Sequence, residues 1–449
     1  MLVDTYKGRH TTTSPGSVAA FGEAVFAVAA HRPAGEQLGT ALRLDPELVS
    51  AHALKGFGSV LLGKQENFAT GRTALREARR CLASRPSPTA SETALVGALA
   101  LAVDGHFQSS ASLLEAHAAS SPGELLPLKL ANAMRFMSGE PRRMRETTGA
   151  ALDHMRGGDP GYGFVLGMHA FALEETGGFE ESERIGRMAV LAEPADVWGV
   201  HAVSHVLEMR GRAEEGTRWL QASRNGWPHC NNFSYHLAWH LALFHLEAAH
   251  YDRVLDLYDR DIRPTDSDDF RDMANAVSLL WRLEQEGIAV GDRWTALYAI
   301  AHRRRVDTSY VFASLHYLLA LIARRDLAAA SELVSGLRQR ANDSDDQSAV
   351  ARSVGVPFAE TILAVAHSTT GDTSVLDNLG RLARDLQAMG GSHAQRDVFM
   401  RTLMRIAADR NDALALAAIS RARGELKCAD RFAAMIDERV ARERLACSA

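Results

Sequence analysis

Seven of the 18 histidines lie between residues 201 and 250, where an even distribution over the 449 residues would place about two. Four of them form two pairs with i, i+4 spacing, His201 with His205 and His236 with His240, so each pair shares one helix face. Glu208 follows His205 by three residues and lies on the same face. Imidazoles titrate near neutral pH, and a neighbouring carboxylate can orient them for proton transfer or anion binding. These five residues are therefore the first candidates for catalysis.

The same pattern admits two other interpretations. The four paired histidines, with a carboxylate beside them, also suit zinc or iron. However, Ala202 follows His201 where a His-Glu-x-x-His zinc protease has glutamate, so that mechanism does not fit. The third interpretation is structural: the imidazoles form hydrogen bonds between helices, with repeat-equivalent glutamates as packing partners, namely Glu174, Glu208 and Glu247. The sequence leaves all three open.

A second candidate site is the turn from Gly390 to Asp397, which reads GGSHAQRD. The two glycines permit a tight turn, and Ser392 is well placed as the N-cap of a helix that begins at His393. Backbone amides in the first helical turn, together with the Arg396 guanidinium, could hold a carboxylate or phosphate, with Asp397 beside them. Alternatively, an ion pair between Arg396 and Asp397 locks the last repeats. Serine, histidine and aspartate on one helical turn are too crowded for a catalytic triad.

Four further side chains complete the predicted ligand-binding surface, because they lie beside these groups or on apolar helices: His169, Trp239, His245 and His316. Trp239 is one of six tryptophans, all of which fall within residues 198–294. Tryptophans interleaved with histidines can form the aromatic wall of a pocket, but they also commonly fill the interfaces between helices. Both roles remain open from the sequence.

Apolar residues at helical spacing predict helices from one end of the chain to the other. Glycines and prolines mark the short breaks between them. No run of strict apolar and polar alternation is bounded by a hairpin turn, so no β-sheet is expected. The clearest helical segments are residues 18–30, 47–62, 93–103, 125–137 and 162–176.

The predicted helices recur in pairs. Leu-Glu dipeptides ending at Glu174 and Glu208, each with a glycine three residues later, are separated by 34 residues, the period of a tetratricopeptide repeat. A third dipeptide, ending at Glu247, follows after 39. The pattern predicts an all-α, tetratricopeptide-like solenoid of stacked antiparallel helix pairs, either open or closed on itself. Equivalent helices lie side by side in such a stack, so both histidine pairs are expected to face one inner groove.

Three longer motifs span residues 201–212 (HAVSHVLEMRGR), 235–247 (YHLAWHLALFHLE) and 390–397 (GGSHAQRD). Together with shorter matches along nearly the whole chain, they resemble the tetratricopeptide repeat protein 38 family. The resemblance implies a single array of tetratricopeptide-like helix pairs. It implies little about activity, because that family is named for its fold. Asn275 and Ser314 stand where the family more often has aspartate, which marks this chain as a divergent member.

The composition argues against several classes of protein. A net charge of −5 and a sequence pI near 6.4 argue against a general nucleic-acid binder. The longest apolar run, residues 94–103, is far shorter than the roughly 18 residues that suggest a membrane span. Asp4 comes early with no apolar segment behind it, so no signal peptide is expected. Four cysteines without a CxxC pair suit a reducing compartment. We therefore expect a cytoplasmic protein with neither nucleic-acid nor membrane partners.

These observations predict one domain over residues 1–449, with the polar residues 340–348 as the one place for a weak subdivision. The predicted function is binding of a peptide or small molecule at an inner surface lined by histidine, tryptophan and glutamate. The alternative is an enzyme that acts on a small molecule by histidine acid–base or metal-assisted catalysis in the enclosed centre of the superhelix. A third is an assembly scaffold whose histidines only pack. No cofactor other than a metal ion is predicted, and no oligomeric state is indicated.

Overall fold

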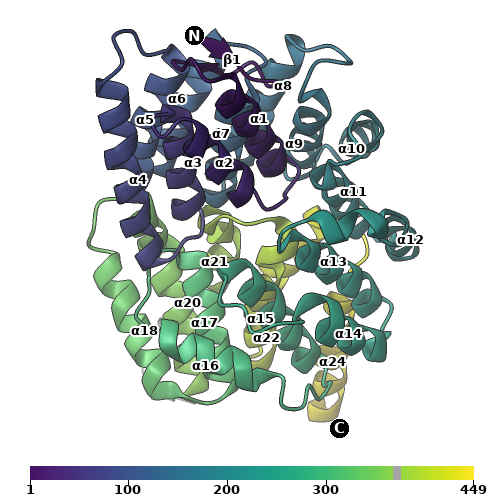
Figure 1. The fold of residues 1–449 in the computed structure, drawn as a ribbon. Coiled ribbons are helices and arrows are strands. Elements are labelled where there is room, and N and C mark those ends of the chain that lie inside the picture. Colours follow the sequence, from purple (N-terminus) through teal and green to yellow (C-terminus); the bar gives the residue numbers. More distant parts are fainter. Residues whose placement is uncertain (368–375, 449) are drawn as a thin grey trace. The chain divides into compact units, whose positions relative to one another are not determined.

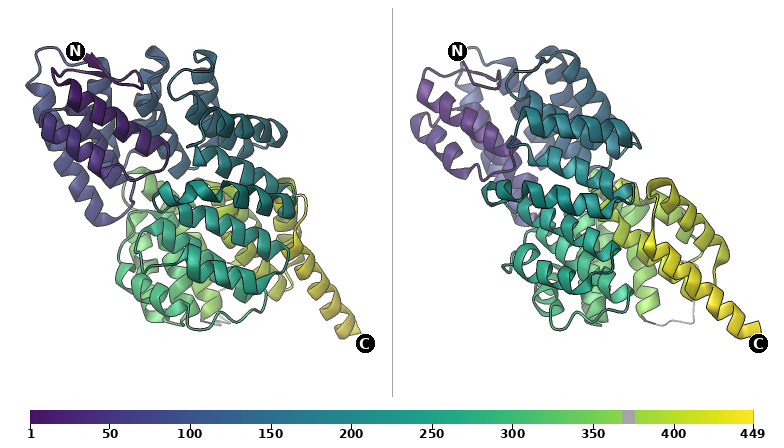
Figure 2. Two further views of the ribbon diagram at one scale, coloured as in Figure 1. Left: turned by 45° about the vertical axis from the view of Figure 1, so that its right-hand side comes forward. Right: turned by 90° about the vertical axis from the view of Figure 1, so that its right-hand side faces the viewer.

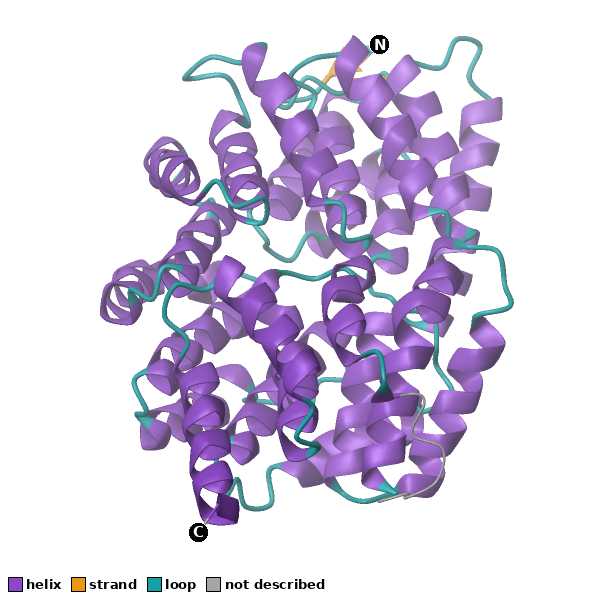
Figure 3. Cartoon of the chain, turned by 180° about the vertical axis from the view of Figure 1, so that it is seen from behind, coloured by secondary structure: helices purple, strands orange, loops and turns teal. Residues whose placement is uncertain are grey.

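The computed structural model describes residues 1–367 and 376–448, and nearly all of its regular structure is helical (Figures 1 and 3). Short turns join the helices, and helices that follow one another in the chain pack together. This confirms the predicted all-α fold of stacked helix pairs. The chain divides into two compact units: unit 1 contains residues 1–206 and 222–234, and unit 2 contains residues 207–221 and 235–449. Residues 340–348 lie inside unit 2.

Unit 1 is a succession of helix pairs, shown in two further views in Figure 2. Its elements are β1 (Leu2–Val3), β2 (Arg9–His10), α1 (Pro15–Ala29), α2 (Gly35–Leu44), α3 (Val49–Val60), α4 (Gln65–Ala83), α5 (Ala90–Val103), α6 (Phe107–Ser120), α7 (Leu125–Met137), α8 (Pro141–Asp153), α9 (Tyr162–Glu174), α10 (Phe179–Ala192) and η1 (Arg224–His229). Within it α1 packs on α2, α3 on α4, and α9 on α10.

Three helices contain residues of both units: α11 (Val197–Met209), α12 (Ala213–Ser223) and α13 (Phe233–Glu247). A close approach in unit 1 fixes the first part of α11. A Cβ on Gly186 of α10 would lie 2.7 Å from Cγ2 of Val203 on α11, so only glycine fits there without displacement of the helix. This contact positions the segment that carries His201 and His205.

Unit 2 contains the remaining helices. They are α14 (Tyr251–Leu257), η2 (Tyr258–Ile262), α15 (Phe270–Gln285), α16 (Trp294–Arg304), α17 (Val311–Ala323), α18 (Leu327–Arg340), α19 (Asp346–Val350), η3 (Ala351–Gly355), α20 (Val356–Ala366), α21 (Leu379–Asp385), η5 (Leu386–Met389), α22 (His393–Asp409), α23 (Ala413–Leu426) and α24 (Arg431–Ser448). Here α15 packs on α17 and α22, and α23 packs on α21 and α22. Side chains on α15, α22 and α23 therefore come close together.

A short hairpin at the N-terminus departs from the sequence prediction. β1 and β2 pair in antiparallel fashion. The Asp4 carboxylate accepts hydrogen bonds from the backbone amides of Tyr6 at 2.7 Å and Gly8 at 2.9 Å, and it lies 2.9 Å from Nε2 of His10. Strands of two residues are too short to produce an alternating pattern, so the expectation of no sheet was wrong for these residues.

One helical stretch within the described residues, 346–366, has the length and apolar composition that could cross a membrane. It combines α19, η3 and α20, and it includes Arg352 and Glu360. Glu360 forms an ion pair with Arg338 of α18 at 2.7 Å, and Ile362 is buried in unit 2. The core helix of a soluble protein meets the same criteria, so this stretch is weak evidence for a membrane span.

Candidate ligand cavity and buried histidine pairs

The histidine pair of unit 1 is buried and internally hydrogen-bonded. His201 is 1% exposed and His205 is 0% exposed. Their Nε2 atoms lie 3.0 Å apart, as the i, i+4 spacing on α11 predicts. Both rings contact Phe171 of α9, with centroid distances of 5.4 and 5.3 Å. Because one imidazole must donate and the other accept, the tautomers of the two rings are linked.

Two carboxyl groups from α9 lie next to this pair. Glu174 is the last residue of α9 and Glu175 is its C-cap, and both are buried, at 0% and 6% exposure. Oε2 of Glu174 lies 3.6 Å from Nδ1 of His205. One oxygen from each glutamate and one nitrogen of His205 all lie within 4.8 Å of one another. The sequence indicated Glu174 as a packing partner, and it did not indicate that Glu175 joins it.

A buried lysine lies near the start of α11. Lys129 of α7 is 8% exposed, and its Nζ lies 3.1 Å from Nε2 of His31 and 5.4 Å from the centre of the Trp198 ring. Asp196, which is 1% exposed, accepts a hydrogen bond from the amide of Gly199 at 3.1 Å. Burial lowers the pKa of Lys129 and raises that of Asp196, while the attraction between their charges opposes both shifts. Neither residue was predicted from the sequence.

The histidine pair of unit 2 has different partners. His236 donates from Nδ1 to Oδ1 of Asn275 at 2.9 Å, and Nδ1 of His240 lies 3.3 Å from Oε2 of Glu208. The two rings meet edge to face, 4.8 Å apart. The side chain of Asn275 is a neutral amide, which pairs here with a neutral imidazole. The groove expected to contain both histidine pairs stays a prediction, because the pairs belong to different units.

Burial sets the protonation states around this second pair. It lowers the pKa of His236 to about 4, and it lowers that of His240 well below the ordinary value. The pKa of Glu208 is raised to about 7, chiefly by burial, with Lys427 opposing the rise and Asp397 adding to it. Both imidazoles are therefore neutral near pH 7, and Glu208 is the member of this set that exchanges a proton there.

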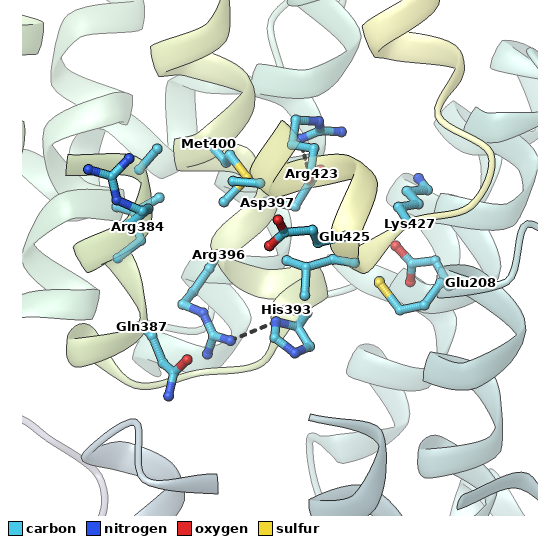
Figure 4. Close-up of a pocket in the computed structure, with 15 residues that line it drawn as sticks. Glu208, Arg384, Gln387, His393, Arg396, Asp397, Met400, Arg423, Glu425 and Lys427 are labelled. Carbon is cyan, nitrogen blue, oxygen red and sulfur yellow. Dashed lines mark hydrogen bonds and ion pairs between the residues drawn. The ribbon is translucent and has the colours of Figure 1, made fainter. Parts of the chain in front are cut away.

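Glu208 also lines a cavity of about 230 Å³ in unit 2 (Figure 4). The ends of α11, α21, η5, α22 and α23 form its wall. Figure 4 shows Glu208 and Lys427 at one side and Arg384 and Gln387 at the other. The polar and charged lining residues are Glu208, Arg384, Gln387, His393, Arg396, Asp397, Arg423, Glu425 and Lys427. Two sets of residues that the sequence indicated separately, Glu208 and the turn that begins α22, thus share one cavity.

Ser392 caps α22 as predicted. Its Oγ accepts a hydrogen bond from the amide of Gln395 at 3.2 Å, and the Gln395 side chain accepts one from the amide of Ser392 at 3.0 Å. Arg396 donates to the carbonyl oxygen of Gly391 and to Nδ1 of His393, the latter at 3.0 Å (Figure 4). The capping box therefore fixes the helix start, and Arg396 holds the preceding turn and His393 in place.

Asp397 is held by arginines from two other helices. Nη2 of Arg282 on α15 lies 3.5 Å from its carboxylate, and Arg423 on α23 forms a closer ion pair. Arg423 also contacts Asp430 at 2.7 Å. Burial alone would raise the pKa of Asp397, but the two arginines hold it well below its ordinary value. The sequence did not indicate these two partners, because both arginines reach Asp397 from helices distant in the chain.

The charges around the cavity favour an anion. Four cationic side chains line it, against three carboxyl groups: Glu208, Asp397 and Glu425. Protonation of Glu208 leaves two carboxylates against the same four cations. Lys427 already pairs with Glu247 at 2.9 Å, and Arg423 pairs with Asp397. Arg384 is exposed at the cavity, and Arg396 is buried, at 5% exposure.

Two of the other predicted ligand residues lie elsewhere. His169 is in unit 1, half-buried, with Nδ1 at 2.9 Å from Oγ1 of Thr148, and burial lowers its pKa. His245 lies near the end of α13, with Nδ1 at 3.5 Å from Nδ1 of His250. Neither residue lines the cavity of unit 2. Their assignment to a ligand site stays a prediction.

Trp239 and His316 are core side chains of unit 2. Trp239 is 0% exposed, donates from Nε1 to Oγ of Ser278 at 3.2 Å, and carries the Arg282 guanidinium over its ring at 5.5 Å. His316 donates from Nδ1 to the carbonyl oxygen of Phe312, one turn earlier on α17, at 2.8 Å. Burial lowers the pKa of His316 to about 3. Trp239 therefore supports the cavity indirectly. It packs against Arg282, whose guanidinium lies near Asp397 of the cavity lining.

The sequence analysis did not indicate Arg282, which pairs with Asp397, or these polar residues of the lining: Arg384, Gln387, Arg423, Glu425 and Lys427. Arg282 gave a signal, because a charge stands inside the apolar helical run of residues 276–283 and must find a partner when buried. Arg423 lies in the charged second half of α23 and Lys427 is the C-cap residue of that helix, and neither gave such a signal. No protein-family model matches the chain. The family resemblance therefore rests on the motifs, and the function is argued from the geometry.

Proposed function

We propose that this helical-repeat protein binds a small anionic molecule in the cavity of unit 2, and that Glu208 supplies a proton-exchanging carboxyl to that site. One observation carries the proposal. Glu208, next to a buried neutral imidazole, and the His393–Asp397 turn at the start of α22 line the same cavity. Converging polar groups with shifted pKa values in one cavity are the usual mark of a binding or active site.

The size of the cavity favours a small molecule over a peptide. At about 30 Å³ per water molecule, 230 Å³ corresponds to roughly eight waters, and it lies below the range of roughly 300–1,000 Å³ for drug-sized ligands. A carboxylate or phosphate compound of few atoms would fit. Such an anion would meet the guanidinium groups of Arg384 and Arg396, which both line the cavity.

A protonated Glu208 would help to bind such an anion. The loss of its negative charge removes a repulsion between the carboxyl group and the bound anion. Because its pKa is about 7, the carboxyl is half protonated near neutral pH. Binding is therefore expected to strengthen as the pH falls through 7.

The second candidate function is catalysis, and the same pKa favours it. A general acid or base works best when its pKa lies near the operating pH. Glu208 meets this condition, whereas the pKa values of His236 and His240 are too low for a general acid at neutral pH. If the protein is an enzyme, we propose Glu208 as the acid–base group and the histidines as its support. Catalysis predicts that a bound compound is released chemically altered, which NMR of the ligand would detect.

Two broader parts of the proposal rest on the sequence. We place the chain as a divergent relative of the tetratricopeptide repeat protein 38 family, on the strength of residues 201–212, 235–247 and 390–397. We also propose a cytoplasmic location, which the cysteine content supports.

Calorimetric titration of the full chain with inorganic phosphate, acetate, oxalate and succinate at pH 6 tests the binding proposal. We expect saturable binding of at least one of these anions. Arg384→Gln should weaken it about tenfold, the effect of losing one charge-assisted hydrogen bond. Arg381→Gln is the matched control, because Arg381 lies on the same helix but is 75% exposed and outside the lining. Equal affinity in the two variants, or no saturable binding at all, would contradict the proposal.

A further inference from the structure

We propose that unit 1 binds a divalent transition-metal ion, zinc, manganese or iron(II), between Glu174, Glu175 and His205. One donor atom from each residue lies within 4.8 Å of the other two. All three side chains are buried, at 0%, 6% and 0% exposure. This site is separate from the cavity of unit 2 and does not depend on the function proposed for it.

The three residues are held by helices and not by flexible loops. Glu174 and Glu175 close α9, where the amide of Glu175 donates to the carbonyl of Phe171 at 3.0 Å. His205 lies in the middle of α11, which Gly186 allows to pack closely against α10. Ligands on packed helices keep their geometry before the metal binds, which reduces the entropy lost on binding.

The distance from Glu174 to His205 fits two atoms that share a metal ion. Oε2 and Nδ1 lie 3.6 Å apart, which is beyond a hydrogen bond. Two ligands at about 2.1 Å from a tetrahedral ion are separated by about 3.4 Å. A small movement would therefore bring both atoms to bonding distance.

The hydrogen bond between the histidines selects the required tautomer. The other nitrogen of His205, Nε2, lies 3.0 Å from Nε2 of His201. When His205 donates from Nε2 to His201, its Nδ1 carries the lone pair that a metal needs. Metal-bound histidines commonly donate from their second nitrogen in this way, which fixes the ring orientation. His201 is thus assigned as a positioning residue for His205.

The chemistry of the donors limits the choice of metal. Two carboxylates and an imidazole suit zinc, manganese or iron(II), whereas calcium and magnesium prefer oxygen donors alone. A divalent cation would also balance the two carboxylate charges in this buried place. Three protein ligands leave a coordination position for water, as in zinc sites that carry out reactions. This ligand set differs from the metal site predicted from the sequence, which consisted of four histidines. His205 is the one residue that belongs to both.

Metal binding is measured on the full chain after chelator treatment, by titrating Zn²⁺ and Mn²⁺ separately and measuring bound metal after dialysis. We expect about one equivalent of metal per chain, with Zn²⁺ bound more tightly than Mn²⁺. Glu175→Gln and His205→Ala should each abolish this binding. His201→Gln should weaken it about 10- to 100-fold, as expected for loss of an orienting partner.

A second buried histidine–glutamate pair in unit 1 supplies the control. His117 lies 2.8 Å from Glu124, and metal binding should be unchanged in His117→Gln and Glu124→Gln. The visible absorption of bound Co²⁺ reports on the ligands directly, and it should be lost in Glu175→Gln even if His205→Ala fails to fold. Less than about 0.1 equivalent of bound metal would overturn the proposal. Retention of metal in Glu175→Gln, with loss in His240→Ala, would overturn it as well.

Discussion

Nδ1 of His240 lies 3.3 Å from Oε2 of Glu208, and both side chains are almost completely buried. The imidazole is neutral, so the proton that moves near pH 7 belongs to the carboxyl. When Glu208 is ionised, His240 donates to it from Nδ1, and when Glu208 is protonated the carboxyl donates to the imidazole. This pair makes the cavity of unit 2 sensitive to pH, and the first two predictions follow from it.

Glu208 should make stability depend on pH. Its folded pKa of about 7 lies above the ordinary glutamate value of 4.5, so the folded state binds more protons than the unfolded state between these values. Proton binding by Glu208 therefore stabilises the folded state. This stabilisation is fully present below about pH 4.5 and is lost as the pH rises through 7. Glu208→Gln, which does not titrate, should gain about 2–3 kcal/mol relative to wild type between pH 5 and pH 8. Urea unfolding at both pH values measures this difference.

The matched control for this experiment is Glu214→Gln. Glu214 lies on α12 with its side chain 94% exposed, so its removal should shift stability equally at both pH values. An identical wild-type-to-variant difference for Glu208→Gln at pH 5 and pH 8 would show that the carboxyl titrates normally.

Anion binding should follow the same proton. Suppose that the ligand binds only when Glu208 is protonated. The fraction of the protein with a protonated Glu208 then falls from about 90% at pH 6 to about 10% at pH 8. The apparent Kd for the anion rises about tenfold over the same range. In Glu208→Gln the affinity should be nearly the same at both pH values. Calorimetry with the best anion from the panel tests this. A pH effect of equal size in the variant would assign the dependence to another group.

The Asp397 ion pairs should contribute strongly to stability. Asp397→Asn leaves Arg282 and Arg423 buried, at 1% and 3% exposure, without the carboxylate that they share. Breaking a buried ion pair on one side costs about 3–5 kcal/mol. The midpoint of urea unfolding at pH 7 should fall accordingly. Asp385→Asn, at a carboxylate that is 41% exposed on α21, should change it by less than about 0.5 kcal/mol.

The contribution of the capping box at the start of α22 to the stability of the protein can be measured separately. Ser392→Ala removes the acceptor for the amide of Gln395 and should cost about 1 kcal/mol. Ser392→Asn keeps an N-cap acceptor and should restore most of that loss. Thermal unfolding of the two variants gives the comparison. Equal midpoints for alanine and asparagine would mean that the cap does not stabilise the helix.

Local features of the fold could be predicted because they depend on residues close together in the sequence. The helix predicted at residues 125–137 is α7, and the one predicted at 162–176 is α9, which ends two residues earlier. The N-cap at Ser392 was read from its neighbours alone. The i, i+4 spacing placed His201 beside His205, and the structure confirms their contact. Side-chain period and capping chemistry act over one or two helical turns, so the sequence contains this information directly.

The partners of each buried charge were decided by tertiary packing. Asp397 pairs with Arg282 and Arg423, which lie 115 and 26 residues away in the chain. The pKa of Glu208 likewise depends on burial and on Lys427, which the sequence around it does not contain. Desolvation and Coulomb energies depend on distances in space, and one chain without its fold does not specify them. The sequence by itself therefore determined the helices and their chemically active faces, and the packing of those helices decided which groups meet and which one exchanges a proton near pH 7.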